Sequence, residues 1–300
     1  MSVSTPAGIV VVDKPSGWTS HDVVARVRRT LGTRKVGHAG TLDPMATGVL
    51  VLGFGRATRL LGHLMLTEKT YAATVRLGVV TSTDDAEGEV LATTPTEHVS
   101  EADVRAAVAG QAGEIDQVPS SVSAIKIDGK RAYARVRDGE DVELPARRVT
   151  VHEAEAGEFR RDGDALDFEL RVRCSSGTYI RAMARDVGAT LGVGGHLTAL
   201  RRGSVGPFTL VDARNTDLDH LTVMSIDDAA RMAFPVLDLD EAQASDVRFG
   251  RPLTGLALGS DAPVALFDSA GHFLALYEQR GDDARAVAVF ADPVTGSAKA

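Results

Sequence analysis

Residues 166–174 read LDFELRVRC, in which apolar and charged side chains alternate. Successive side chains of a β-strand point to opposite faces of the sheet, so this segment would carry one apolar and one charged face. A strand that is buried on one face only is typical of an antiparallel sheet. Strand-like and helix-like segments elsewhere in the 300 residues follow one another without regular alternation. The sequence therefore predicts an α+β fold rather than a doubly wound parallel sheet.

Other segments of the chain fit one of these two elements. Short apolar or alternating runs predict strands over residues 9–12, 49–52, 71–77 and 148–151. Apolar residues at helical spacing predict helices over residues 21–31, 57–65, 100–109 and 181–191. Thr19 and Ser20 can cap the first of these helices, and Gly192, Gly194 and Gly195 would end the last.

A domain boundary is predicted near Phe234-Pro235, which divides the chain into residues 1–235 and 236–300. The second part contains a short helical segment at 240–248 and strand-like segments at 264–267, 273–277 and 286–290. A mostly β unit of this length is about as small as a unit with its own core can be.

The chain contains one cysteine, Cys174, so it cannot form an intramolecular disulfide, and nothing indicates an oxidising compartment. The sequence does not open with the basic segment and long apolar core of a secretory signal. The longest apolar runs, such as residues 9–12 and 49–52, are far too short to cross a bilayer. We therefore expect a cytoplasmic protein with no membrane association.

Charge is distributed unevenly along the chain. The net charge is −8, which by itself argues against a nucleic-acid partner. However, residues 14–69 and 171–202 are both basic, whereas residues 84–117 contain Arg105 as their one basic residue. This distribution is compatible with binding a polyanion on one face. Charge scattered over a solvated surface is the alternative.

A glycine-rich turn at residues 37–48, GHAGTLDPMATG, holds a single carboxylate, Asp43. Pro44 biases Asp43 toward extended geometry, and the glycines allow tight bends and close approach of a ligand. A carboxylate held in this way can act as a covalent nucleophile toward a sugar or an electron-poor ring. It can equally be an ordinary turn cap.

Four further segments accompany this turn in a fixed order. They are DKPSG (13–17), KTY (69–71), GTYIR (177–181) and LRR (200–202). Together the five segments closely resemble the tRNA pseudouridine synthase B family over about residues 9–206. Residues 250–253, GRPL, and the strand pattern after them resemble the small PUA-type RNA-binding domain that ends such enzymes. The resemblance implies a pseudouridine synthase core, with a mixed and largely antiparallel sheet flanked by helices, and a small mostly-β PUA-like domain.

The resemblance also implies an activity, which is isomerisation of the T-loop uridine at position 55 of tRNA to pseudouridine. The N1–C1′ bond breaks, the uracil turns, and C5 is joined to C1′. The uridine must first leave the loop stack and enter a pocket. This chemistry needs no cofactor or metal, in keeping with a sequence that has no P-loop, dinucleotide-binding glycine pattern or clustered Cys/His ligands.

Three residues match the catalytic residues of the family. Asp43 would be the nucleophile, and attack at C1′ of the ribose or at C6 of the uracil are both open. Arg181 would pair with it, because a fixed guanidinium orients a carboxylate and favours its ionised form. Tyr71 would stack on the uracil and is the candidate for taking the C5 proton. Without the resemblance, Arg181 would be read as a surface arginine and Tyr71 as a half-buried strand residue.

Other matched residues are predicted to bind the substrate. His38 would pack into the RNA loop and hold the base out, although a lone histidine is more often structural. Lys14 would contact a phosphate or position its loop, or else be a solvated turn lysine. Leu200 would form an apolar wall of the uracil pocket or belong to the core. Arg202 would contact the RNA backbone or be a surface charge, and Tyr179 is placed in the same group.

Residues 119–143 resemble the insertion that clamps the T-loop in the family, with Lys126 among its basic residues. Their glycines and polar side chains suit a loop that becomes ordered on RNA. The expected partner is the T-arm of tRNA, with no obligatory protein partner and a monomeric state.

Three alternatives are open. The first is a non-catalytic protein that binds or folds tRNA on the same fold, and the pair Asp43 and Arg181 speaks against it. The second is a relative guided by another RNA, which would be expected to carry basic extensions. The third is a glycosidase, which ordinarily needs two carboxylates across the bond.

Overall fold

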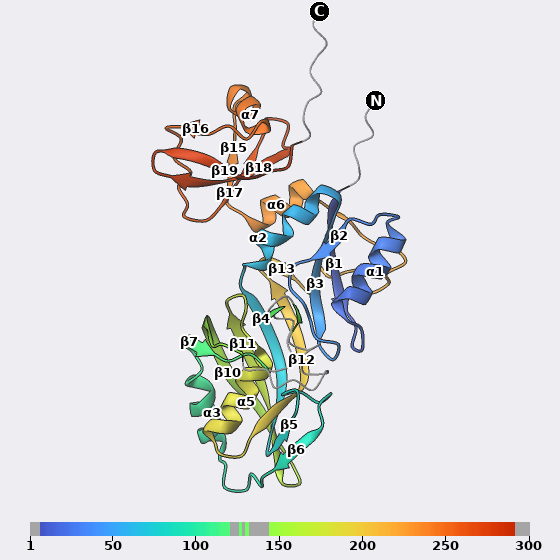
Figure 1. The fold of residues 1–300 in the computed structure, drawn as a ribbon, viewed down its shortest axis with the longest axis vertical. Coiled ribbons are helices and arrows are strands. Elements are labelled where there is room, and N and C mark those ends of the chain that lie inside the picture. Colours follow the sequence, from blue (N-terminus) through green and yellow to red (C-terminus); the bar gives the residue numbers. More distant parts are fainter. Residues whose placement is uncertain (1–6, 121–125, 128–129, 132–143, 292–300) are drawn as a thin grey trace, which may run out of the picture.

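The computed structural model describes residues 7–120, 126–127, 130–131 and 144–291. Figure 1 shows an elongated molecule in which a large sheet with its helices occupies most of the length and a small sheet lies at one end. Ten strands of the described chain form the large sheet, in the order β14-β1-β3-β12-β4-β11-β10-β7, with β2 beside β3 and β13 beside β12. The strands are β1 (Gly8–Lys14), β2 (Val36–His38), β3 (Thr47–Phe54), β4 (Lys69–Leu77), β7 (Gly113–Gln117), β10 (Arg147–Asp162), β11 (Ala165–Cys174), β12 (Gly195–Val205), β13 (Phe208–Thr209) and β14 (Met224–Ser225).

The sheet is mixed and largely antiparallel, as predicted. Among the paired strands of this sheet that the structure describes, β3 and β12 run parallel, with Arg201 opposite Thr47, and the other pairs are antiparallel. The alternating segment lies in β11, between β4 and β10, and its apolar side chains are buried. One residue of the charged face, Asp167, is also buried, because Arg76 Nε donates to it at 2.7 Å. The α+β prediction is therefore confirmed.

Two helices cover the apolar face of the sheet, one against β10 toward the β7 edge and one against β4 and β12 near its centre (Figure 1). They are α3 (Glu101–Ala109) and α5 (Ile180–Thr190), and their apolar side chains form one cluster with those of β4 and β11. The helix α1 (Ser20–Thr30) packs Val23, Val24 and Val27 into a second cluster with β1 and β3. Thr19 caps α1 by accepting from the backbone N–H of Asp22, as the sequence predicted.

Two predicted elements differ from the structure. The helix expected over residues 57–65 is a 3-10 turn, η1 (Gly55–Arg59), followed by the short helix α2 (Leu61–Met65). The break lies at Leu60, whose N–H bonds to Ala57 three residues back rather than four. The strand expected at 148–151 is the start of the 16-residue β10, whose outer half is mostly exposed and charged and so has no clear alternation.

The small sheet has five strands, in the order β15-β17-β18-β19-β16. They are β15 (Val236–Asp238), β16 (Leu253–Thr254), β17 (Val264–Phe267), β18 (Phe273–Arg280) and β19 (Asp283–Val289), accompanied by α7 (Glu241–Arg248). The sheet begins just after α6 (Ile226–Ala233), and the domain boundary at 235–236 stays a prediction. Phe267, Phe273 and Phe290 join a cluster with α2 and α6, so the two sheets share part of a core.

Two hairpins complete the described chain. One is formed by β5 (Val79–Thr81) and β6 (Val90–Thr93), and the loop between these strands reaches the centre of the large sheet through a bridge from Asp85 to Leu197. The other is formed by β8 (Lys126–Ile127) and β9 (Lys130–Arg131). The remainder of the predicted insertion 119–143, apart from residues 119–120, lies outside the described residues.

Candidate active site

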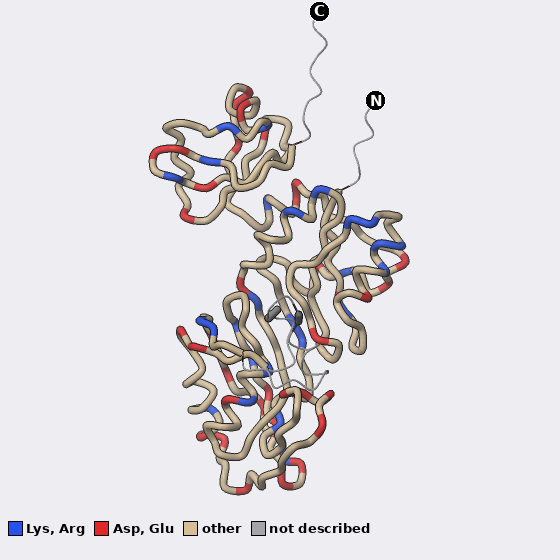
Figure 2. Tube along the Cα trace, viewed as in Figure 1, with Lys and Arg blue, Asp and Glu red and all other residues tan. Residues whose placement is uncertain are grey.

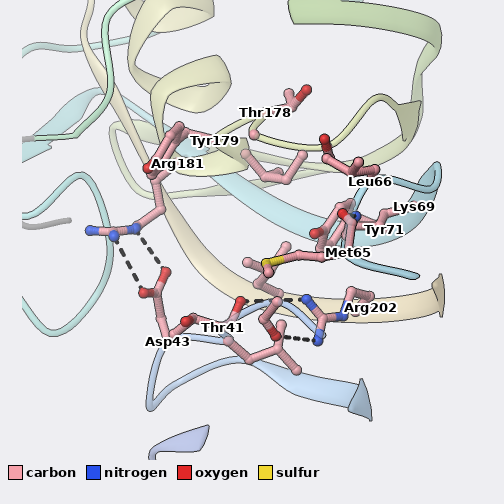
Figure 3. A pocket seen from close by; sticks show the side chains of 16 residues that line it. Thr41, Asp43, Met65, Leu66, Lys69, Tyr71, Thr178, Tyr179, Arg181 and Arg202 are labelled. Atoms are coloured by element: carbon pink, nitrogen blue, oxygen red, sulfur yellow. Dashed lines mark hydrogen bonds and ion pairs between the residues drawn. The ribbon is translucent and has the colours of Figure 1, made fainter. Parts of the chain in front are cut away.

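A pocket of about 370 Å³ opens beside the centre of the large sheet. It lies between the loop that holds Asp43, the end of α2, the strands β4 and β12, and the first turn of α5 (Figure 3). Six of the nine predicted site residues line it, namely Asp43, Tyr71, Tyr179, Arg181, Leu200 and Arg202. Residues from four separate sequence segments therefore meet in one cavity.

The loop that carries Asp43 is held from several sides. The buried Ser20 hydroxyl accepts from Leu42 N–H at 2.8 Å, and Gly17 N–H donates to Pro44 O at 2.9 Å. Gly48 has a φ of 101°, and a Cβ at this position would lie 2.2 Å from the carbonyl oxygen of Arg202. Glycine is required there for both the backbone conformation and the close approach of β12. Asp43 thus sits on a fixed loop rather than on a free turn.

Arg181 contacts both carboxylate oxygens of Asp43. Its Nε lies 3.0 Å from Oδ2 and its Nη2 lies 3.4 Å from Oδ1 of the carboxylate (Figure 3). The arginine side chain is 5% exposed, whereas the Asp43 side chain is 35% exposed. A planar guanidinium holds both carboxylate oxygens in one orientation. The carboxylate therefore keeps a defined orientation while it remains open to the pocket.

A second carboxylate holds the other side of this guanidinium. Asp85 Oδ2 lies 3.3 Å from Nη1 of Arg181, which also donates to Thr83 O at 2.8 Å. Asp85 is 3% exposed, so it lies behind Arg181 and cannot serve as a second carboxylate across a glycosidic bond. Our sequence reasoning missed Asp85 because it lies in the acidic segment 84–117, which reads as solvated surface.

The opposite wall of the pocket is formed by adjacent strands. Arg202 of β12 is the register partner of Tyr71 of β4, and Leu200 lies two residues before it. Burial raises the pKa of the Tyr71 phenol, and the charge of Arg202 opposes that rise. The phenol is therefore neutral near pH 7. The pocket therefore has the Asp43 carboxylate at one end, while the wall opposite combines Tyr71 and Leu200 with the basic residues Lys69 and Arg202.

Arg202 is not a surface charge, contrary to one of the sequence readings. It is buried, and its guanidinium donates to Val49 O at 2.8 Å, Gly40 O at 3.1 Å and Thr41 O at 3.4 Å. These bonds join β12 to the loop that leads to Asp43 (Figure 3). Burial leaves its guanidinium little surface for an RNA phosphate, but Arg202 does line the pocket, and its contact with the substrate stays a prediction.

Lys14 also differs from the expectation of a solvated lysine. The side chain is buried, and Nζ donates to Trp18 O at 2.6 Å, Pro15 O at 2.9 Å and Pro44 O at 3.2 Å. Burial lowers its pKa to about 8. Of the two roles predicted for it, the structure fits loop positioning, since an ammonium turned toward three carbonyls does not present itself to a phosphate.

Three other residues, His38, Tyr179 and Lys126, were predicted to bind the substrate. His38 is half-buried in β2 outside the pocket, with its ring edge-on to that of His21 at 5.8 Å. Tyr179 precedes α5 at the pocket rim, and Gln117 fixes its backbone by accepting from its N–H at 2.8 Å. Lys126 belongs to β8, and the structure describes only the strand pairing at this position. The roles of these three residues stay predictions.

The basic surface is smaller than the charge counts suggested. Lys14, Lys69, Arg181 and Arg202 are buried, and Arg173 and Arg201 pair with Glu153 and Asp13. Figure 2 shows basic positions along α1 and acidic ones in the loops beside β5 and β6. A uniformly basic face is therefore not formed by the segments 14–69 and 171–202.

No described cluster of three or more His, Cys, Asp or Glu side chains could hold a metal ion. Among the helices that the structure describes, none has the length and apolar character needed to span a bilayer.

Comparisons with known proteins show which family the chain belongs to. The family model of the N-terminal domain of the TruB family pseudouridylate synthase matches residues 28–180, and two C-terminal models of tRNA pseudouridine synthases match residues 181–242 and 234–291. A tRNA pseudouridine synthase B of Thermobifida fusca is 57% identical over 290 residues, covering 95% of this chain and 98% of that protein. One of Streptomyces griseus is 56% identical over 299 residues, covering 96% and 98%.

A solved structure shows the same fold. A chain in the crystal structure of a Cbf5-Nop10-Gar1 complex superposes with a TM-score of 0.69 at 26% identity, covering 95% of this chain and 85% of that one. The fold and the matched domains define a pseudouridylate synthase, which is an isomerase. Within that class, this chain belongs to the TruB family.

Proposed function

We propose that this enzyme converts the T-loop uridine at position 55 of tRNA to pseudouridine, with Asp43 as the nucleophile. The observation that carries the proposal is the two-point contact of Arg181 with Asp43, at 3.0 and 3.4 Å, on a carboxylate that faces the pocket. The names of the relatives from Thermobifida fusca and Streptomyces griseus support tRNA as the substrate.

The reaction begins when the uridine leaves its loop and enters the pocket, at a cost of a few kcal/mol. Its uracil would lie against Tyr71 and Leu200, with the ribose edge toward Asp43. An apolar wall favours the face of a base, and a charged end favours the polar reacting edge. The depth of burial differs accordingly, since Leu200 is buried while Asp43 is open to solvent.

The chemical steps balance without any added reactant. Asp43 forms a covalent bond with C1′ or with C6, and both routes are compatible with a carboxylate at this end of the pocket. The N1–C1′ bond breaks, the uracil turns, and a C5–C1′ bond forms as Asp43 leaves. The proton on C5 is then lost and N1 gains one, so the product is an isomer of the substrate. Tyr71 is the candidate acceptor of the C5 proton, and because its phenol is neutral near pH 7, it would have to pass on its own proton in the same step.

Arg181 would contribute by orientation. Catalysis by a positioned nucleophile depends on holding the reacting atoms in a near-attack geometry. The guanidinium fixes both oxygens of Asp43 before the substrate arrives, so this ordering cost is not added to the barrier. We place the reaction in the cytoplasm, and expect a monomer that needs no protein partner.

Tritium release from tRNA that carries 5-³H-uridine tests the proposal. Wild type should release tritium, and Asp43→Asn should release none while it binds tRNA with nearly unchanged affinity. A tRNA with cytidine at position 55 should release none with either protein. Asp43→Asn activity within about tenfold of wild type would rule out the nucleophile assignment. Tight binding without release by wild type would favour the non-catalytic alternative.

A further inference from the structure

The helix α2 ends at the mouth of the pocket in two exposed apolar residues. Met65 is 43% exposed and Leu66 is 73% exposed, and both line the pocket. Figure 3 shows them on the side of the cavity away from Asp43, next to Tyr71 and Lys69. Single exposed apolar residues are common on protein surfaces. Met65 and Leu66, however, are adjacent in sequence and lie together at the rim of the pocket.

The sequence of α2 explains why these side chains point outward. Leu61 and Leu64 are three residues apart, so they lie on one face of the helix, and both are buried against β3 and η1. With that face directed into the core, the residues that follow Leu64 are turned toward the pocket. The exposure of Met65 and Leu66 is thus a consequence of how the helix is anchored.

The backbone at this rim is fixed. Lys69 is buried, and its Nζ donates to Met65 O and to Thr67 O, both at 2.8 Å. Gly206 N–H donates to Glu68 O at 2.8 Å, which ties the same turn to the end of β12. Burying an ammonium costs desolvation free energy, and the two hydrogen bonds to backbone carbonyls offset part of this cost. The same two bonds fix the backbone of the turn. The two apolar side chains are therefore presented on a rigid support.

We propose that Met65 and Leu66 form an apolar lip that packs against the RNA base next to the extruded uridine. The proposal rests on the function above and adds a substrate contact to it. When one base leaves a stack, the faces of its neighbours lose their cover. Apolar side chains that take the place of a removed base are a known way to keep a distorted nucleic acid in its open form.

The chemistry of the rim favours a base over other parts of RNA. A phosphate or a ribose hydroxyl would gain nothing from Leu66, whereas every base offers an apolar face to stack or pack on. Met65 and Leu66 also line the same pocket as Tyr71 and Leu200, so a base next to the extruded uridine would lie within reach of the lip. Leu66 is exposed in the free enzyme and would be buried against a base in the complex.

The test compares Leu66→Ser with a matched control, Val211→Ser. Val211 is 74% exposed, close to the value for Leu66, and it does not line the pocket. A T-arm stem-loop RNA carries 2-aminopurine beside the target uridine, and its affinity and fluorescence are measured with each protein. Leu66→Ser should weaken binding about tenfold and lose the fluorescence change that wild type produces. Val211→Ser and the conservative Leu66→Met should stay within about twofold of wild type.

The dependence of binding on salt separates this contact from a phosphate contact. Loss of a phosphate contact reduces the slope of log K against log salt, whereas loss of an apolar contact lowers affinity at every salt concentration by the same factor. Leu66→Ser should therefore keep the wild-type slope. A changed slope, or binding and fluorescence equal to those of Val211→Ser, would overturn the proposal. So would a wild-type dimer that Leu66→Ser dissociates, because a second chain would then occupy the lip.

Failure of the lip and failure of the proposed function give different results. Tritium release by wild type is measured on the same stem-loop. If wild type releases tritium and Leu66→Ser binds RNA as tightly as wild type, the proposed lip is contradicted and the proposed activity is not. No release by wild type, with Leu66→Ser still binding about tenfold more weakly, removes the isomerisation step and leaves the base contact in place.

Discussion

Nη1 of Arg181 lies 3.3 Å from Oδ2 of Asp85, a carboxylate that is 3% exposed and sits behind the pocket. Asp85 thus holds the buried side of the guanidinium, and the opposite edge of the same group contacts Asp43 in the pocket. Removing one member of a buried charged pair leaves the other uncompensated, so such pairs are sensitive to substitution. We assign Asp85 as a positioning residue, which acts on Asp43 through Arg181.

Replacement of Asp85 by asparagine should lower the rate of the chemical step by about 10- to 100-fold with little effect on RNA binding. The shape is kept, but the charge that orients Arg181 is lost. The matched control is Asp84→Asn, because Asp84 has a φ of 59°, which asparagine tolerates, and pairs with Arg185 instead. Single-turnover rates at saturating RNA provide the measurement. Equal rates for the two variants would contradict the positioning role.

Arg181→Lys should also reduce turnover strongly. A lysine keeps the positive charge but loses the planar fork that contacts both oxygens of Asp43 and reaches Asp85 as well. Arg185→Lys, one helical turn further along α5, is the comparison, since Arg185 is half-buried and does not touch Asp43. Tritium release is compared for both proteins. Normal turnover by Arg181→Lys would mean that a point charge beside Asp43 is sufficient.

The sequence predicted the arrangement of the catalytic residues better than their environment. The family resemblance placed Asp43, Arg181 and Tyr71 in one site, and the structure brings their side chains to one pocket. Alternation predicted β11, because a strand buried on one face has period two. Neither approach indicated that Lys14 and Arg202 are buried, since each is satisfied by backbone carbonyls from distant segments, such as Pro44 and Val49.

Asp85 was missed for a related reason. Its burial depends on the hairpin of β5 and β6 folding back so that Asp85 pairs with Leu197 in β12. Local sequence shows only an acidic run in which every carboxylate looks solvated. The full length of β10 was not predicted either, because the outer half of this strand has exposed charged side chains on both faces and so lacks the alternation of a half-buried strand. Long-range contacts, rather than local propensity, decide both cases.

Gly48→Ala should destabilise the fold and the catalytic loop together. The alanine Cβ would lie 2.2 Å from Arg202 O, and the φ of 101° is itself unfavourable for alanine. Gly17→Ala is the control, because its φ is 81° with no atom of the described chain within 4 Å of the new Cβ. It should cost about 1–2 kcal/mol of unfolding free energy, and Gly48→Ala clearly more. Urea unfolding measures the free energy of unfolding of both variants. Equal losses would show that β12 moves away from the new Cβ without a measurable loss of stability.

Buried lysines should make the stability of this protein rise between pH 8 and 10. The pKa of Lys14 and of Lys69 is lowered from 10.5 to about 8, chiefly by burial, and the positive charge of Arg202 contributes to the lowering at both lysines. In this pH range the unfolded chain therefore binds more protons at these positions than the native state does. The free energy of unfolding then gains up to about 1.4 kcal/mol per pH unit from each lysine.

Lys69→Met isolates one of these contributions. Urea unfolding of wild type and of Lys69→Met is measured at several pH values from 7.5 to about 10. The difference in unfolding free energy, wild type minus variant, should grow with pH, since only wild type is relieved of a buried ammonium as it deprotonates. Val211→Ser serves as the control and should give a constant difference. A difference for Lys69→Met that stays flat or shrinks with pH would mean that the native ammonium keeps its proton, held by the carbonyls of Met65 and Thr67.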